Sequence, residues 1–357
     1  MAETRRDLHP GAWWVWALCL AVVAGRTTNP LLLLLVIGVA ARVAVSCRTP
    51  GPWGAALRMF LVMGLAVLGI RLVFHLLLGG VGGPTVLFTL PEIPLPQWAA
   101  SIRLGGPVSA EGVVQALSFG LQLATMLCCV GAANAVADPR RLLRSLPAAL
   151  YEISVAVVVG LTLAPQLAAS ARAVRRARAL RGEPVRGRAA IRSLLVPVLE
   201  EAFERSLQLA ATMDARGYGR SGDVSPGHRR LTSALVLAGL LGLAVGGYGL
   251  LDATAPAVLG LPVLLAGALL SVAALRLSAR RVTRSRYRRP RWDPASVAVA
   301  LSGAVGAVVV LAVQALGTAD AGALVLSTVP LKAPALPVVP ALAVLVGLAP
   351  LALARAR

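Results

Sequence analysis

The chain has 357 residues, of which 57% are hydrophobic and only 14% are charged. A soluble domain carries nearer a quarter of charged residues, and several apolar runs here approach the ~18 to 20 residues that cross a bilayer. These runs are continuous and do not alternate, which excludes a transmembrane β-barrel. We therefore predict an all-α polytopic membrane protein.

The net charge is +20, from 35 basic and 15 acidic residues. On a soluble protein this excess would indicate nucleic-acid binding. Here the arginines gather between apolar runs, as the positive-inside rule describes for cytoplasmic loops, and few aromatic residues accompany them. We therefore expect this protein to lie in the lipid bilayer and not to bind nucleic acid.

The apolar runs predict about eight transmembrane helices. We expect them at Gly11–Gly25, Pro30–Ser46, Ala56–Leu78, Gly112–Val136, Leu231–Leu250, Pro256–Leu277, Ala295–Gly317 and Ala335–Ala354. The first run has the length of a signal peptide, but a second run follows at once, so we expect a retained helix. The loop Gly79–Gly106 is rich in glycine and proline, which predicts irregular structure.

The positions of the arginines predict which loops lie on the cytoplasmic side of the membrane. Sixteen arginines lie between Arg140 and Arg230, whereas the predicted external loops hold only Arg26, Arg103 and Lys332. This asymmetry predicts a multi-pass protein of the cell membrane with both termini cytoplasmic. It divides the chain into a four-helix transmembrane part (1–136), a cytoplasmic or interfacial segment (137–230) and a C-terminal transmembrane part of about four helices (231–357).

One stretch of the middle segment, Ala148–Ala169, is itself apolar enough to span. If it crossed the membrane and nothing nearby crossed back, the basic cluster Arg276–Arg291 would face outward, against the positive-inside rule. We therefore expect a long helix at the cytoplasmic interface, with a spanning helix as the alternative.

The middle segment contains two helices that are predicted to end in Arg-Gly. Leu180-Arg181-Gly182 follows an arginine-rich stretch, and Ala215-Arg216-Gly217 follows a helix predicted to begin at Pro197. Glycine adopts the left-handed conformation that stops a helix, and an arginine beside it suits both the helix dipole and carboxylates of a partner.

The helix before Gly217 has one predicted apolar face. It is made by Leu195, Val198, Leu199, Ala202, Phe203, Leu207, Ala210 and Met213, at spacings of three and four residues. Glu200, Glu201, Glu204, Arg205 and Gln208 are expected on the solvated side, with Glu201 and Arg205 paired. We interpret Glu200 and Glu204 as solvated and not as catalytic carboxylates.

Residues that could carry catalysis are few. Lys332 is the only lysine and lies in a predicted external loop, so no cytoplasmic phosphate loop exists and any ATPase must be another chain. The three histidines lie far apart in the sequence, and the four cysteines are expected to pack in helices. We therefore expect no catalytic, cofactor or metal site. Arg71 and His75, in the third span, are intramembrane polar residues that point either to function or to pairing within the bundle.

Four sequence features resemble the transmembrane T component of energy-coupling factor transporters, the family that includes the Q subunit of cobalt uptake systems. They are Leu8-His9-Pro10, Asn29-Pro30, the run from Asp138-Pro139-Arg140 to Leu180-Arg181-Gly182, and the run from Leu199-Glu200-Glu201 to Ala215-Arg216-Gly217-Tyr218. Together they span about Leu8 to Tyr218.

The resemblance implies a non-catalytic subunit that transmits ATP hydrolysis by two partner ATPases to a substrate-binding S component, for uptake of a vitamin or transition-metal ion. It implies that Arg181 and Arg216, with Gly182, Ala215 and Gly217, meet the ATPases. It also implies S-component contact by the apolar face from Leu195 to Met213 and by the run from Tyr151 to Leu167.

The chain departs from the family pattern in two ways: Leu180 stands where alanine is usual, and three spans follow the fifth. The alternative function is a membrane scaffold or secondary transporter that needs no ATPase, with a basic loop that binds anionic lipid.

Overall fold

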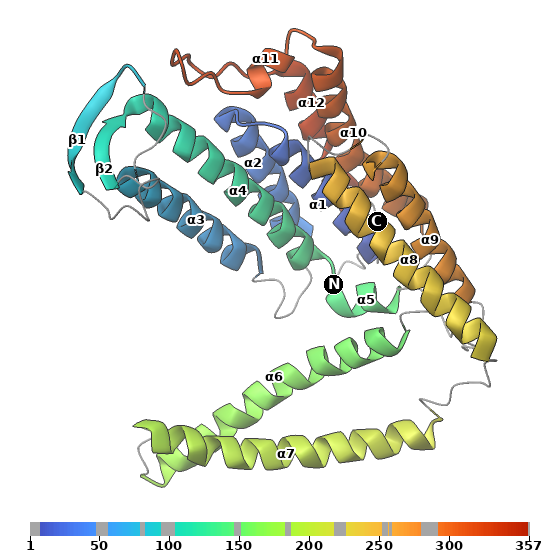
Figure 1. Ribbon diagram of the computed structural model, residues 1–357. Coiled ribbons are helices and arrows are strands. Elements are labelled where there is room, and N and C mark those ends of the chain that lie inside the picture. Colours follow the sequence, from blue (N-terminus) through green and yellow to red (C-terminus); the bar gives the residue numbers. More distant parts are fainter. Residues whose placement is uncertain are drawn as a thin grey trace. The chain divides into compact units, whose positions relative to one another are not determined.

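The computed structural model describes residues 8–47, 56–78, 83–93, 104–145, 151–182, 187–217, 226–251, 256, 259–279 and 292–355. The chain forms two compact units, one of Met1–Leu142 with Pro290–Arg357 and one of Leu143–Arg289 (Figure 1). Apart from one β-hairpin, the described secondary structure is helical, which confirms the predicted all-α class.

The first unit joins the early helices to the last helices of the chain. It contains α1 (Pro10–Gly25), α2 (Pro30–Cys47), α3 (Ala56–Leu78), α4 (Ala110–Val136), α10 (Pro294–Leu316), α11 (Ala321–Leu324), α12 (Val338–Val346) and α13 (Pro350–Arg355). The short helix α5 (Pro139–Arg144) contains the boundary with the second unit. Helices α1, α2 and α10 begin with proline, whose missing N–H is not needed in a first turn.

The core of this unit is built around α1, which packs against α2, α4 and α10. Trp16 is fully buried, and its Nε1 donates a hydrogen bond of 3.0 Å to the Gly347 carbonyl, between α12 and α13. A Cβ on Gly303 of α10 would lie 2.7 Å from the Trp16 backbone, so the two helices approach closely only because this position is glycine. Buried neighbours include Leu20, Leu32, Val36, Val299 and Val310.

The segment between α3 and α4 contains an antiparallel hairpin, β1 (Val86–Ile93) with β2 (Leu104–Ser109). The prediction of irregular structure for Gly79–Gly106 was therefore wrong over these strands. The prolines that motivated it are tolerated, because Pro91 falls at an irregularity in the register and both strands are edge strands.

The second unit contains two pairs of helices. In one pair α6 (Tyr151–Leu180) packs against α7 (Gly187–Ala215), and in the other α8 (Pro226–Leu251) packs against α9 (Leu261–Ala279). Helix α7 begins ten residues before Pro197, so the predicted start at that proline was wrong. Proline removes one helical hydrogen bond but does not end a helix that good helix formers continue on both sides.

Six described helices are long and apolar enough to cross a membrane: Pro30–Cys47, Leu57–Leu77, Ala110–Val136, Val155–Leu180, Arg230–Gly249 and Pro294–Leu316. Five of them fall on predicted spans. The other three predicted spans correspond to shorter apolar helices at Pro10–Gly25, Pro262–Leu277 and Val338–Leu353. The remaining long helix is α6, so the helix expected at the interface also meets the criterion for crossing. The chain is a multi-pass membrane protein.

Candidate functional site

The two Arg-Gly helix ends have the same backbone geometry. Gly182 has φ +75° and Gly217 has φ +71°, in the left-handed region that favours glycine. The Gly182 N–H donates to the Ala179 carbonyl at 3.2 Å, and the Gly217 N–H donates to the Asp214 carbonyl at 2.8 Å. The prediction that these glycines stop their helices is confirmed.

The side chains at these ends are open to their surroundings. Arg181 and Arg216 are exposed, and neither forms an ion pair with any residue that the structure describes. A Cβ at Gly182 or Gly217 would meet nothing within 4 Å. Leu180, beside the first arginine, is 89% exposed. Both ends thus present a cation next to bare backbone.

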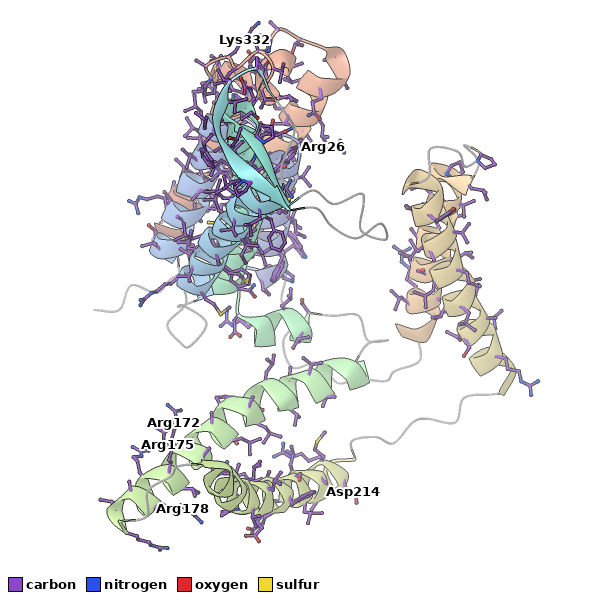
Figure 2. The ribbon with its side chains drawn as sticks, turned by 60° about the vertical axis from the view of Figure 1, so that its left-hand side comes forward. Arg26, Arg172, Arg175, Arg178, Asp214 and Lys332 are labelled. Carbon is purple, nitrogen blue, oxygen red and sulfur yellow. The ribbon has the colours of Figure 1, made fainter. Side chains whose placement is uncertain are left out.

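The fold does not bring the two Arg-Gly ends together. Helices α6 and α7 run antiparallel, so the end of α6 and the end of α7 lie at opposite ends of the pair (Figure 1). Figure 2 labels Arg178 near one end and Asp214 near the other. The two Arg-Gly ends therefore do not form one shared site.

The predicted apolar face of α7 is divided in the structure. Val198, Ala202 and Met213 are half-buried, whereas the large apolar residues at four-residue spacing are exposed. These form what we call the open stripe of α7: Leu195 and Leu199, each 49% exposed, Phe203, 67% exposed, and Leu207, 72% exposed.

The charged side of α7 is divided as well. Glu200 and Glu204 are exposed, as predicted for a solvated face. Glu201 instead accepts a hydrogen bond from the buried Ser170 hydroxyl of α6, and its other oxygen lies 2.5 Å from Arg205 Nη2. The predicted Glu201–Arg205 pair is confirmed. Sequence periodicity gave no sign of the contact between Glu201 and α6.

Arg71 has an aromatic neighbour that the sequence did not reveal. Its Cζ lies 5.5 Å from the centroid of the Phe119 ring on α4, a cation–π contact worth about 0.5 to 1 kcal/mol at an exposed site. His75 is half-buried one turn later on α3.

Within the described residues, no three His, Cys, Asp or Glu side chains gather to hold a metal ion. The buried Cys128 and Cys129 are free thiols that pack in the core, as predicted.

Two of the four sequence features contact the end of the chain. The His9 N–H donates to Ser296 Oγ at 2.9 Å, and the His9 ring stacks on Trp292 with centroids 4.8 Å apart. The Asn29 amide donates to the carbonyls of Ala323 and Ala335 at 2.7 and 2.6 Å. The hydrogen-bonded partners are 287 to 306 residues apart in the sequence, and no motif connects them.

A family model described as CbiQ, cobalt transport protein, matches residues 1–226. The match contains all four sequence features and ends at the first residue of α8, so the rest of α8 and all later helices lie outside it. No curated protein matches the chain. The family match covers more than half of the chain and includes both Arg-Gly ends, and the chain therefore belongs to the CbiQ cobalt transport protein family, the T components of energy-coupling factor transporters.

Proposed function

We propose that this protein is the transmembrane coupling subunit of an energy-coupling factor transporter and has no catalytic activity of its own. The observation that carries the proposal is the α6–α7 pair, two packed helices that each end in an exposed Arg-Gly. The division into 1–136, 137–230 and 231–357 then separates a membrane part, a coupling segment and a C-terminal membrane part, with both termini cytoplasmic.

Arg181 and Arg216 contact acidic residues of two ATPase subunits in this proposal. A guanidinium fork fits a carboxylate with two parallel hydrogen bonds, and the bare backbone at Gly182 and Gly217 lets a partner surface approach closely. Ala215 is exposed beside Arg216 and completes the second contact. Because the two ends lie at opposite ends of the helix pair, each one meets a different ATPase subunit.

The S component binds the open stripe of α7. Each of its four side chains would contribute about 1.5 to 3 kcal/mol on full burial, so the stripe can hold an apolar partner surface. Val198, Ala202 and Met213 border the stripe and are already half-buried. The S component therefore contacts only their exposed outer edges.

The transported substrate is a vitamin or a transition-metal ion held by the S component. The family description names cobalt, so Co²⁺ is the first substrate to assay.

The proposal is tested with the double variant Arg181→Glu/Arg216→Glu. Each reversal replaces an attraction to acidic groups by repulsion, and a hydrogen bond to a charged group is worth about 1.5 to 3 kcal/mol, so we expect at least about a tenfold loss of co-purified ATPase. Co-purification from host membranes in mild detergent is quantified by mass spectrometry, and uptake of radioactive Co²⁺ is measured in cells. Arg230→Glu/Arg276→Glu, at two exposed arginines of α8 and α9, is the matched control.

An unaltered amount of ATPase with the α6–α7 variant would overturn the proposal. Recovery of no nucleotide-binding subunit with the unaltered chain would favour the ATPase-independent scaffold or secondary transporter instead.

A further inference from the structure

Helix α6 has two unlike halves. From Val155 to Ala169 it has no charged residue, and none of these side chains is buried by the described part of the chain. The helix from Val155 to Leu180 also meets the length and hydropathy of a membrane span. Eight of the fifteen residues are exposed, and all of these except Gln166 are apolar. An apolar helix surface that remains exposed needs hydrocarbon, or an equally apolar partner, around it.

The second half begins with an arginine group, which we define as Arg172, Arg175 and Arg176. All three side chains are exposed, and none forms an ion pair within the described residues. Arg172 Nε donates to the Ala168 carbonyl at 3.1 Å, which leaves both Nη atoms for an outside acceptor. Figure 2 shows Arg172 and Arg175 projecting outward from α6.

The distance between the two halves matches a membrane boundary. Arg172 and Arg176 follow Ala169 by three and seven residues, which is about 4.5 to 10 Å along the helix axis. The headgroup layer beyond the hydrocarbon is about 5 to 8 Å thick on each side. In an upright helix this spacing places the guanidinium groups at the depth of the lipid phosphates, and in a helix that lies tilted in the interface the long arginine side chains reach the same layer.

We propose that the arginine group of α6 binds the phosphates of anionic phospholipids while the apolar half of the helix lies in the hydrocarbon. Three cations without an ion-pair partner among the described residues attract anionic headgroups, and the planar guanidinium fits phosphate oxygens in pairs. An acidic protein surface would satisfy the arginines equally well, but it would leave the adjoining apolar half uncovered. The proposal requires neither coupling to an ATPase nor a particular side of the membrane.

The test compares lipids that remain bound to the full-length protein. The chain is purified from vesicles that contain phosphatidylcholine and phosphatidylglycerol, and the retained lipids are counted by native mass spectrometry. For Arg172→Gln/Arg175→Gln/Arg176→Gln we expect the preference for phosphatidylglycerol to fall by about fivefold for each arginine removed. The loss should be largest at low ionic strength, because salt screens exposed charges.

Two further variants are matched to the first. Arg26→Gln/Arg230→Gln/Arg276→Gln removes the same charge at three exposed positions elsewhere and should keep the preference. Arg172→Lys/Arg175→Lys/Arg176→Lys keeps the charge and should retain most of it.

An unchanged preference in the α6 variant, or an equal loss in the control, would overturn the proposal. Loss of a co-purifying acidic protein with no change in retained lipid would overturn it in favour of protein binding. Arg181 and Arg216 are intact in all three variants, so ATPase co-purification from the same samples reports on the coupling proposal separately.

Discussion

The turn between α1 and α2 and the α6–α7 pair differ in where their side chains find partners. At the turn, Thr27, Thr28 and Asn29 each bond to the segment 323–335 of the same chain. On α6 and α7, large apolar residues and arginines remain exposed. The polar side chains of the turn have their hydrogen-bond partners within the chain, whereas the arginine group of α6 has no ion-pair partner among the described residues. This difference supports the proposal that the α6–α7 pair contacts partners, and it predicts that substitutions at the α1–α2 turn act mainly on stability.

The largest expected effect is the loss of stability caused by Trp16→Ala in α1. The indole is fully buried and hydrogen-bonded to Gly347, so its loss leaves a cavity and an unpaired carbonyl, at a cost of about 3 to 5 kcal/mol. Thermal unfolding in detergent should show a large drop in midpoint. Leu18→Ala, at a half-exposed position of the same helix, should have little effect, and an equal drop in both variants would contradict this account.

A smaller loss of stability is expected from Asn29→Leu, at the turn between α1 and α2. The variant leaves the carbonyls of Ala323 and Ala335 without their donor, which costs about 2 to 3 kcal/mol. Asn134→Leu is the matched control, because that amide bonds only to the Val130 carbonyl of its own helix among described residues. If the two variants have the same unfolding midpoint, the contact of Asn29 with residues 323 and 335 contributes little to stability.

The open stripe of α7 predicts the opposite behaviour. Phe203→Ser/Leu207→Ser should change the free energy of unfolding by less than about 0.5 kcal/mol, because neither side chain is packed in the isolated chain. The same variant should lose its co-purifying S component. A marked loss of thermal stability would show that the stripe is packed within the chain, and would remove the contrast between the two regions.

The smallest effect concerns pH and His9. Burial lowers the pKa of His9 from its ordinary value of 6.5, so the folded protein favours the neutral ring, whose Nδ1 accepts the Gly11 N–H. The unfolded chain binds the proton more readily, and stability should therefore fall slightly as the pH drops below 6.5 and level off below the lowered pKa. His9→Asn keeps a capping side chain without the titration and should flatten this dependence, as measured by unfolding midpoint against pH.

Local features were predictable from the sequence because local rules produce them. Continuous apolar runs predicted membrane helices, and the glycines at 182 and 217 predicted helix ends. The hairpin was missed because a count of prolines and glycines does not say where strand register is irregular. The division of the α7 face was missed because a spacing of three and four residues identifies apolar residues but not which of them meet α6.

The packing of the last helices on α1 and α2 was beyond sequence reasoning for another reason. Trp16 and Gly347, or His9 and Ser296, have no shared motif or period that connects them. Their contacts depend on how whole helices pack, as when Gly303 lets α10 approach α1. The family match ends at residue 226 and therefore did not contain α10 or the helices after it.

The bond between Trp16 and Gly347 has a consequence for how the protein is made, because its partners are 331 residues apart. At roughly 5 to 20 residues per second, a ribosome needs about 20 to 60 s to add the second partner after the first. Throughout that time α1 is in the membrane without α10 and α12, and the amide of Asn29 is without its acceptors. Helices α1 and α2 must therefore wait until residues 323–347 have been added before they reach their native packing.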